Sequence, residues 1–293
     1  MSETETIQQL SKTLDPIPTG MEPKLEKLPG IKAVLFDIYG TLLISGTGDV
    51  GSADPAGKAE AMRQALEEAG FGLRGDYVAE EALAGLKTTI GFVHEKIKEQ
   101  GGDYPEVDIL KVWTAVTGML TTRQILQPSE AEDAIRTLAL QYECLSNPTW
   151  EMPGARELLK DLTEQGLTLG IVSNAQFYTP FVLEAHLGAS VEALGFDPDL
   201  CVWSYELLRA KPSKAMFPPC LNRLAEQGIE PAEILYVGND LLNDVATAGA
   251  AGCKTTLFAG DQRSLRMREG DPRVDGVVPD AVVTSLEQVG ELL

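Results

Sequence analysis

Residues 31–42 read IKAVLFDIYGTL and contain the segment that decides the fold. The apolar run 31–36 is rich in branched and aromatic side chains and follows the turn-forming pair Pro29-Gly30, as is typical of a buried strand. It ends at Asp37, and Gly40 allows a tight turn close to a bound molecule. We therefore expect a strand that places a carboxylate at its carboxyl end.

Further apolar runs of the same kind follow after residue 150. They lie at residues 167–172, 200–203, 234–237, 254–258 and 281–284, and helical patterns lie at 155–165, 181–186, 214–227 and 243–251. Apolar strands that alternate with helices predict an α/β fold with a parallel sheet covered on both faces. Ligands of such sheets bind at the carboxyl ends of the strands, so Asp37 falls where a site is expected.

The stretch between the first two strands has a different pattern, because helical signals fill it and no convincing strand is visible. One helix is predicted from apolar residues spaced three or four apart: Leu83, Leu86, Ile90, Val93 and Ile97. Asp54-Pro55 predicts the start of an earlier helix, and Ser129-x-x-Glu132 predicts a capping box for a later one. We therefore expect an inserted all-α domain.

These patterns divide the chain into three parts. Residues 1–30 are polar and rich in proline, and we expect an N-terminal arm with a short helix near residues 5–12. Residues 31–44 and 151–293 form the predicted α/β core, and residues 45–150 form the predicted helical domain.

The composition excludes several classes of function. The chain carries 44 acidic against 24 basic residues, a net charge of −20, which argues against nucleic acid as a partner. No apolar run is long enough to span a bilayer, and the first residues do not resemble a signal peptide. The cysteines are scattered, as expected of reduced thiols. We expect a soluble cytoplasmic protein with a small-molecule partner; the oligomeric state is not indicated.

Polar residues that could take part in catalysis or binding recur at or near the predicted strand ends. Ser173-Asn174 offers a hydroxyl and an amide that can hold anionic oxygens, and Lys211 adds a cation. Asp240 and Asp244 bring two carboxylates to one strand-to-helix turn. Each could by itself be a helix cap or a surface residue. Their order and placement together indicate one site with Asp37.

That order resembles the haloacid dehalogenase (HAD) superfamily of hydrolases, over about residues 31–290. Asp37-x-x-Gly40-Thr41-Leu42 is similar to the first motif of the family, which carries a nucleophilic aspartate. Ser173 matches the second motif, Lys211 the third, and residues 238–244 the acidic fourth. The resemblance implies a Rossmann-like core, and it implies that the helical insert is a cap domain that closes over the substrate.

The resemblance also implies a mechanism. Asp37 would attack the substrate and form an ester or acyl phosphate that water then hydrolyses. Ser173 and Lys211 would stabilise the substrate's anionic oxygens or the charge on Asp37, and Asn174 would help to bind those oxygens. The implied catalytic residues are Asp37, Tyr39, Thr41, Ser173 and Lys211.

In the phosphatase members of the family a Mg²⁺ ion bridges the nucleophile and the phosphate. Its implied ligands are Asp37, the main-chain oxygen of Tyr39 and a fourth-motif side chain. Asn239, Asp240 and Asp244 are the candidates for that side chain. The sequence leaves open which of Asn239 and Asp240 faces the metal.

Tyr39 departs from the phosphatase pattern, which has a second Asp there as general acid and base. Haloacid dehalogenases have Tyr at this position, and halide leaves without a proton. A metal-independent 2-haloacid dehalogenase is therefore an alternative function. It would need a cation for the substrate carboxylate, yet residues 43–58 contain no Arg, and Arg63 is a weak candidate.

The carboxylates of the fourth motif favour a divalent cation, and with it a Mg²⁺-dependent phosphatase acting on a small phosphorylated metabolite. A catalytically weak binding protein on the same fold is a further alternative, because Tyr39 and Asn239 depart from the family pattern at an acid position and a metal position.

Overall fold

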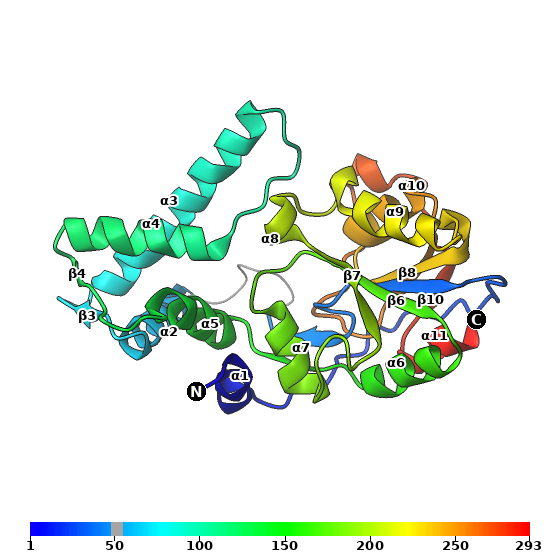
Figure 1. Ribbon diagram of the computed structural model, residues 1–293, viewed down its shortest axis with the longest axis horizontal. Coiled ribbons are helices and arrows are strands. Elements are labelled where there is room, and N and C mark those ends of the chain that lie inside the picture. Colours follow the sequence, from blue (N-terminus) through cyan, green and yellow to red (C-terminus); the bar gives the residue numbers. More distant parts are fainter. Residues whose placement is uncertain (48–54) are drawn as a thin grey trace.

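The computed structural model describes residues 1–47 and 55–293. Within this part of the chain, six parallel strands form the central sheet (Figure 1). In sheet order the strands are β10 (Ala281–Val283), β9 (Lys254–Phe258), β8 (Ile234–Gly238), β1 (Ala33–Phe36), β6 (Thr168–Ser173) and β7 (Phe196–Trp203). The predicted α/β fold with a parallel sheet is confirmed.

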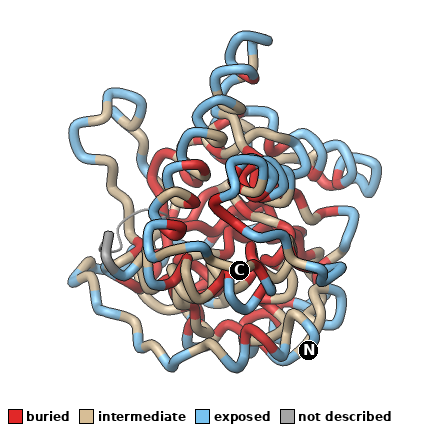
Figure 2. Tube along the Cα trace, turned by 90° about the vertical axis from the view of Figure 1, so that its left-hand side faces the viewer, coloured by how far each residue is buried: buried red, intermediate tan, exposed pale blue. Residues whose placement is uncertain are grey.

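Strand β1 lies in the middle of the sheet and is buried on both faces. Ala33 and Leu35 belong to one hydrophobic cluster, whereas Val34 and Phe36 belong to another on the opposite face. The two faces are covered by different helices (Figure 1), namely α9 (Pro218–Glu226) and α10 (Thr247–Ala250) against α6 (Ala155–Glu164), α7 (Thr179–Leu187) and α11 (Glu287–Glu291). Figure 2 shows the buried residues gathered in the interior, with the exposed ones at loop tips and outer helices.

Some predicted elements differ from the observed ones. Strand β7 begins at Phe196, four residues before the predicted start, because Asp197-Pro198-Asp199 occupies an exposed part of an edge strand and hides the apolar pattern. The predicted helix 214–227 is interrupted before Pro218, so that η1 (Lys214–Met216) precedes α9. The predicted helix 243–251 starts earlier, as the π-helical turn η3 (Leu241–Ala246), and continues as α10.

Four helices within the described residues make up most of the insert between the first two core strands. They are α2 (Pro55–Glu68), α3 (Val78–Glu99), α4 (Ile109–Thr122) and α5 (Ala134–Ser146). None of the described helices combines the length and the apolar sequence required to cross a bilayer. Strand β2 (Leu43–Ser45), on the way out of the core, pairs with β5 (Thr149–Glu151) on the way back.

Two details of the insert depart from the sequence prediction. A short antiparallel pair, β3 (Gly72–Leu73) with β4 (Leu126–Gln127), lies between the helices, and two residues are too few to give a strand pattern. Helix α5 begins after Asp133, and the Ser129 hydroxyl instead accepts from the Ala131 amide, so the predicted capping box is wrong. The helix start predicted at Asp54 lies outside the described residues.

The connection between α3 and α4 forms a second contact between the insert and the core. The Ala210 amide donates to the Tyr104 carbonyl at 2.8 Å, and the Glu106 amide donates to the Leu208 carbonyl at 3.2 Å. Gln176, which follows β6, donates to the Val107 carbonyl at 2.8 Å. The insert is therefore joined to the core beside the carboxyl edge of the sheet.

The N-terminal arm begins with α1 (Glu3–Leu10), which packs against α5 of the insert and α7 of the core (Figure 1). Ile7 is 1% exposed there, and Glu3 pairs with Arg136 of α5 at 2.7 Å. Farther along, the Ile17 amide donates to Asp261 at 3.2 Å, and Lys24 pairs with Val282 of β10 through two main-chain hydrogen bonds. The arm thus links the insert with both the core and the loop that follows β9.

We expect Ile7→Ala to lower the free energy of unfolding by about 2–3 kcal/mol, because the substitution leaves a cavity between α1, α5 and α7. Urea unfolding followed by circular dichroism would measure the change. Gln9→Ala, on the exposed side of the same helix, is the matched control and should change stability little. Equal effects of the two substitutions would show that α1 is not packed as described.

Candidate functional site

The register of the sheet brings the predicted site residues together. Phe36 lies opposite both Ile171 of β6 and Val237 of β8, so the residues that follow these strands meet at one edge. There the Ser173 hydroxyl donates to Oδ1 of Asp37 at 2.9 Å. Both side chains are buried, which fixes the orientation of the carboxylate.

Lys211 lies in the loop after α8 (Ser204–Leu207), and its side chain is 2% exposed. Its ammonium group donates to Asp37 Oδ1 at 2.7 Å, to Asp244 Oδ1 at 2.6 Å and to the Tyr236 hydroxyl at 2.8 Å. Burial by itself lowers the pKa of Lys211, but the carboxylates of Asp244 and Asp37 outweigh it and raise this pKa. Lys211 is therefore a fixed positive charge between two carboxylates.

Asp244 is buried and is held from both sides by the protein. Its Oδ2 accepts from the Asp240 amide at 2.9 Å, and a Cβ atom at Gly238 would lie 2.4 Å from its Cγ, so only glycine fits at that position. Burial raises the pKa of Asp244, and the carboxylates of Asp37 and Asp240 add to this rise against the attraction of Lys211.

Asp240 acts as the N-cap of η3. Its Oδ1 accepts from the amides of Leu242 and Asn243 at 2.9 and 3.1 Å. Arg268 also binds both carboxylate oxygens through its Nε and Nη2 atoms. Sequence reasoning did not find Arg268, because it lies in a loop without a motif or a periodic pattern.

Asn239 lies in a small polar cluster with Thr41 and Ser264. Its Oδ1 accepts from the Thr41 hydroxyl at 3.2 Å, and its Nδ2 donates to the Ser264 carbonyl at 2.6 Å. Gly40, at φ +85°, passes so close that a Cβ atom would lie 2.6 Å from Nδ2 of Asn239. Thr41 therefore hydrogen-bonds to Asn239, and no hydrogen bond joins its side chain to Asp37 within the described residues.

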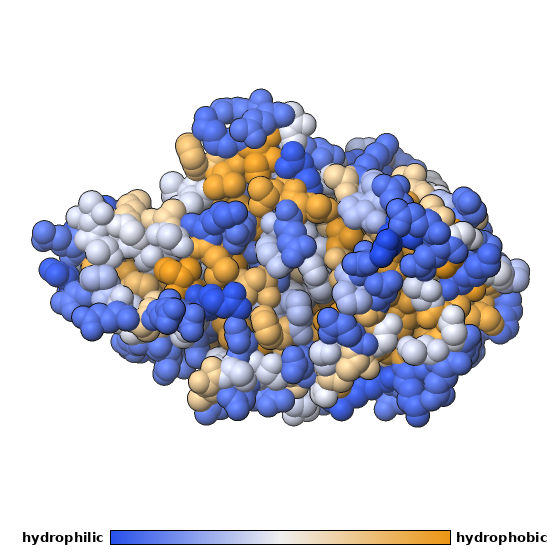
Figure 3. All heavy atoms as spheres, viewed as in Figure 1, coloured by the Kyte–Doolittle hydropathy of each residue, from blue (hydrophilic) through white to orange (hydrophobic). Residues whose placement is uncertain are grey.

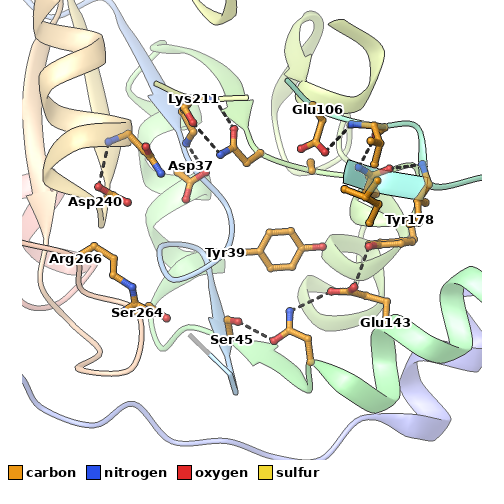
Figure 4. Close-up of a pocket in the computed structure, with 18 of the residues that line it drawn as sticks. Asp37, Tyr39, Ser45, Glu106, Glu143, Tyr178, Lys211, Asp240, Ser264 and Arg266 are labelled. Carbon is orange, nitrogen blue, oxygen red and sulfur yellow. Dashed lines mark hydrogen bonds and ion pairs between the residues drawn. The ribbon is translucent and has the colours of Figure 1, made fainter. Parts of the chain in front are cut away.

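The ring of Tyr39 lies between the Asp37–Lys211 pair and Glu143 of α5 (Figure 4). Its hydroxyl is 3.1 Å from the Thr179 hydroxyl. Burial, and then the nearby Glu143, raise the pKa of Tyr39 far above its ordinary value. The Tyr39 hydroxyl thus remains protonated at neutral pH and is too weak an acid to replace a carboxylic acid.

Asn174 positions the loop of Lys211. Its Oδ1 accepts from the Lys211 amide at 2.7 Å, and its Nδ2 donates to the Lys211 carbonyl at 3.4 Å. This residue therefore contacts the main chain of Lys211, although it also lines the cavity.

The site opens into a cavity of about 460 Å³ between the sheet edge and the helical insert. The insert contributes two carboxyl groups that sequence reasoning missed, Glu106 and Glu143. Burial raises the pKa of both. No motif marks them, because helix periodicity identifies apolar faces and does not show which polar residue meets a cavity. Arg63 does not line this cavity and is paired with Glu60 and Glu67 on the surface of α2.

The described residues contain no group of three or more His, Cys, Asp or Glu side chains placed to hold a metal ion. Both oxygens of Asp240 and of Asp244 are engaged with protein donors, as described above. By contrast, Asp37 Oδ2 and the main-chain oxygen of Tyr39 accept none of the hydrogen bonds between the described residues. Together with Asn239 Oδ1 they form a set of one carboxylate and neutral oxygens. Such a set fits Mg²⁺, which is commonly held by few carboxylates plus phosphate and water.

The family model of haloacid dehalogenase-like hydrolases matches residues 31–252. The chain belongs to this family. Its membership confirms the resemblance expected from the order of the four motifs, and it makes the chain a hydrolase.

Two relatives of this haloacid dehalogenase-like hydrolase are phosphatases by name. The ribulose-1,5-bisphosphate 5-phosphatase of Halopiger xanaduensis is 28% identical, over 89% of this chain and 98% of the relative. The phosphoglycolate phosphatase of Pectobacterium atrosepticum is 26% identical, over 79% of this chain and 81% of the relative.

Among solved structures, a 2-haloacid dehalogenase from Pseudomonas syringae covers 89% of this chain and 97% of its own, with a TM-score of 0.52 and 19% identity. At that identity the likeness supports the shared fold and carries no information about the reaction.

We expect Lys211→Met to lower the free energy of unfolding by about 3–5 kcal/mol, because two buried carboxylates lose their shared cation. Without that cation the pKa of Asp244 in the folded state rises further above its unfolded value. A raised folded pKa gives stability that is present at low pH and lost as the pH rises through it, so the deficit should be larger at pH 8 than at pH 5. Urea unfolding at the two pH values measures it.

The control is Lys214→Met, an exposed lysine in the turn that follows. It should leave stability within about 0.5 kcal/mol of the wild type at both pH values. A Lys211→Met deficit that does not depend on pH would contradict the described pairing with Asp244.

Proposed function

We propose that this hydrolase is a Mg²⁺-dependent phosphatase that transfers the phosphoryl group of a small phosphate monoester to Asp37. The observation that carries the proposal is the state of the Asp37 carboxylate. Ser173 and Lys211 bind Oδ1, whereas Oδ2 accepts no hydrogen bond within the described residues. One oxygen is thus anchored and the other is available as a nucleophile. The phosphatase names of the two relatives support the choice of phosphate.

In the proposed reaction, Oδ2 of Asp37 attacks phosphorus, and the bond from phosphorus to the leaving oxygen breaks with its electron pair on that oxygen. Water then attacks the phosphorus of the aspartyl phosphate, which releases inorganic phosphate and restores the carboxylate. Lys211 and Ser173 stabilise the negative charge on the anionic oxygens throughout. Asn174 acts as a positioning residue, because it fixes the main chain of Lys211.

In this proposal Asp37, the main-chain oxygen of Tyr39 and Asn239 hold the Mg²⁺ ion. When bound, the ion would neutralise part of the negative charge of the carboxylate and the phosphate. Thr41 fixes the amide of Asn239, and Asp244 and Asp240 position Lys211 and the start of η3. The site would thus contain fewer carboxylate ligands than Asp240 and Asp244 suggest from the sequence.

We further propose that the helical insert, residues 45–150, acts as the cap of residues 31–44 and 151–293. Its α3–α4 connection and α5 line the cavity opposite Asp37. A cap that excludes water protects the aspartyl phosphate until the productive water enters.

One observation favours a second candidate, a metal-independent 2-haloacid dehalogenase. Tyr39 occupies the position of the missing acid, and halide leaves without protonation. The cavity would then have to bind the substrate carboxylate through Arg266 or Arg268, since Arg63 lies outside it. Both arginines are engaged with protein oxygens, which makes this the weaker candidate.

The proposal predicts that p-nitrophenyl phosphate is hydrolysed in the presence of Mg²⁺, that EDTA abolishes turnover, and that added Mg²⁺ restores it. Asp37→Asn should reduce the rate by at least about 10³-fold, because an amide is a poor nucleophile. Phosphate release followed in a coupled assay measures each rate. Asp161→Asn on the exposed side of α6 is the matched control and should retain full activity.

Release of halide from 2-chloropropionate in EDTA, without phosphate release, would replace the proposal by the dehalogenase. Absence of both activities in a folded protein would leave the binding-protein alternative.

Tyr39 sets the range of leaving groups. Without a carboxylic acid at this position we expect alkyl phosphates to react about 10²–10⁴-fold more slowly than aryl phosphates, because an alkoxide needs a proton to leave. Tyr39→Asp should make kcat/KM less dependent on the leaving-group pKa across a series of phosphate esters. Tyr39→Phe keeps the ring and should preserve the wild-type dependence. The same slope for Tyr39→Asp and the wild type would show that the missing acid does not limit the reaction.

A further inference from the structure

The cavity is much larger than a phosphate group requires. Its volume of about 460 Å³ is in the range of sites that enclose whole organic molecules. Asp37, Lys211 and Asn239 occupy one end, at the sheet edge, and the helical insert surrounds the other. The chemistry of that second end determines which organic group the site accepts.

The far wall is mainly apolar. Leu86 and Ile90 of α3, Ile109 and Trp113 of α4, and Tyr142 of α5 line it, together with Val107 of the connection. Figure 3 shows hydrophobic residues gathered below the upper end of α3, on the side that faces the core. Such a wall binds apolar groups by removing them from water.

The carboxyl and carboxamide groups of this wall are already satisfied by the protein, whereas the buried Nε2 atom of His94 has no hydrogen-bond partner among the described residues. Glu143 accepts from the Tyr178 hydroxyl at 2.9 Å and from the Asn147 amide at 3.1 Å. Gln176 donates to the Val107 carbonyl at 2.8 Å and accepts from the Ile109 amide at 3.0 Å.

Glu106 is satisfied in the same way, by the Ser204 hydroxyl and the Val107 amide. A sugar or other polyol would have to bury most of its hydroxyl groups against these occupied partners, because His94 Nε2 can bond only one of them, which is unfavourable.

The distribution of charge excludes a second anionic group at this end. Among the described lining residues, every Lys or Arg belongs to the core, namely Lys211, Arg266 and Arg268. Residues 48–54 contain no Lys or Arg either. The cap contributes carboxyl groups and His94, whose pKa is lowered by burial, so the imidazole is neutral at pH 7. A second phosphate or a carboxylate on the substrate would find no cation there.

We propose that this site hydrolyses phosphate monoesters of apolar organic groups of about four to eight carbons, aryl groups in particular, and discriminates against sugar phosphates, bisphosphates and phosphocarboxylic acids. The inference rests on the proposed phosphatase function and follows from the cap wall and not from the catalytic residues. It separates this chain from the substrates named for its relatives, since ribulose-1,5-bisphosphate and phosphoglycolate each carry a second anionic group. An aryl leaving group also needs no general acid, in agreement with Tyr39.

The test is calorimetric titration of the Mg²⁺-loaded protein with n-alkylphosphonates from ethyl to hexyl, which bind without turnover. We expect the affinity to rise about two- to fourfold for each added methylene, with an increasingly negative heat capacity of binding. A hydroxylated chain or a terminal carboxylate of the same length should bind at least about tenfold more weakly than hexylphosphonate. Affinity independent of chain length, or preference for the carboxylate, would overturn the inference.

Ile90→Asn tests the wall itself. It should remove most of the gain from ethyl to hexyl while it leaves ethylphosphonate binding within about twofold of the wild type. Phe92→Asn is the matched control, because Phe92 lies on the same helix and is 62% exposed. If Ile90→Asn does not fold, Ile90→Ala gives the same test with a smaller loss. An unchanged gain in either folded variant would contradict the role of this wall.

The two proposals fail in different ways. Turnover of p-nitrophenyl phosphate with affinity independent of chain length would keep the phosphatase and remove the apolar substrate class. A rise in affinity with chain length, without turnover of any phosphate ester, would keep the apolar site and remove the phosphatase.

Discussion

The structure of the site depends on one buried positive charge. Lys211 lies between the buried carboxylates of Asp37 and Asp244 and balances the negative charge that they bring together. The same ammonium group also contacts the Tyr236 hydroxyl, so that strands β1 and β8 and the turn after β8 are held around a single point. Gly238 is part of the same cluster, because a Cβ atom at this position would collide with the Asp244 carboxylate. Stability and chemistry are therefore joined in this core: the charge that fixes Asp37 is part of the packing.

The core of this site was largely predictable from the sequence. Asp37, Ser173 and residues 238–244 follow apolar runs, and parallel strands must bring such residues to one edge. The sequence could not reveal that Arg268 binds the carboxylate of Asp240, since no pattern relates a loop residue to a helix N-cap 28 positions earlier. Nor could it decide between Asn239 and Asp240, because both fit the spacing; the structure adds that both Asp240 oxygens accept from amides or Arg268, whereas Asn239 Oδ1 accepts only from Thr41 among the described residues. The cap is the hardest part to predict, since helix periodicity places Ile90 and Leu86 on one face without showing what that face meets.

The sheet edge and the helical insert contribute different features to the site. The sheet edge holds the Asp37 carboxylate and the oxygens of Tyr39 and Asn239 at positions that follow from strand register, and the loop of Lys211 adds a cation. The insert supplies a wall of side chains that can change without any effect on that register. Glu106 and Glu143 are less free to change, because each accepts a hydrogen bond from a hydroxyl group of the core. These hydrogen bonds join the wall to the core. The side chains of Leu86 and Ile90 are apolar and form no such hydrogen bond, so a substitution at either position does not disturb this link to the core.

The main-chain pairing of residues 104–106 with 208–210 has a mechanical consequence. The core partner of this pairing ends one residue before Lys211. Any movement that lifts the α3–α4 connection must either break these hydrogen bonds or pull on the segment that carries the ammonium group. Where the hydrogen bonds hold, such a movement also shifts Lys211, and with it the contact that fixes Asp37. In the proposed reaction the Asp37 carboxylate would then be fully held only while the insert covers the cavity and keeps bulk water out.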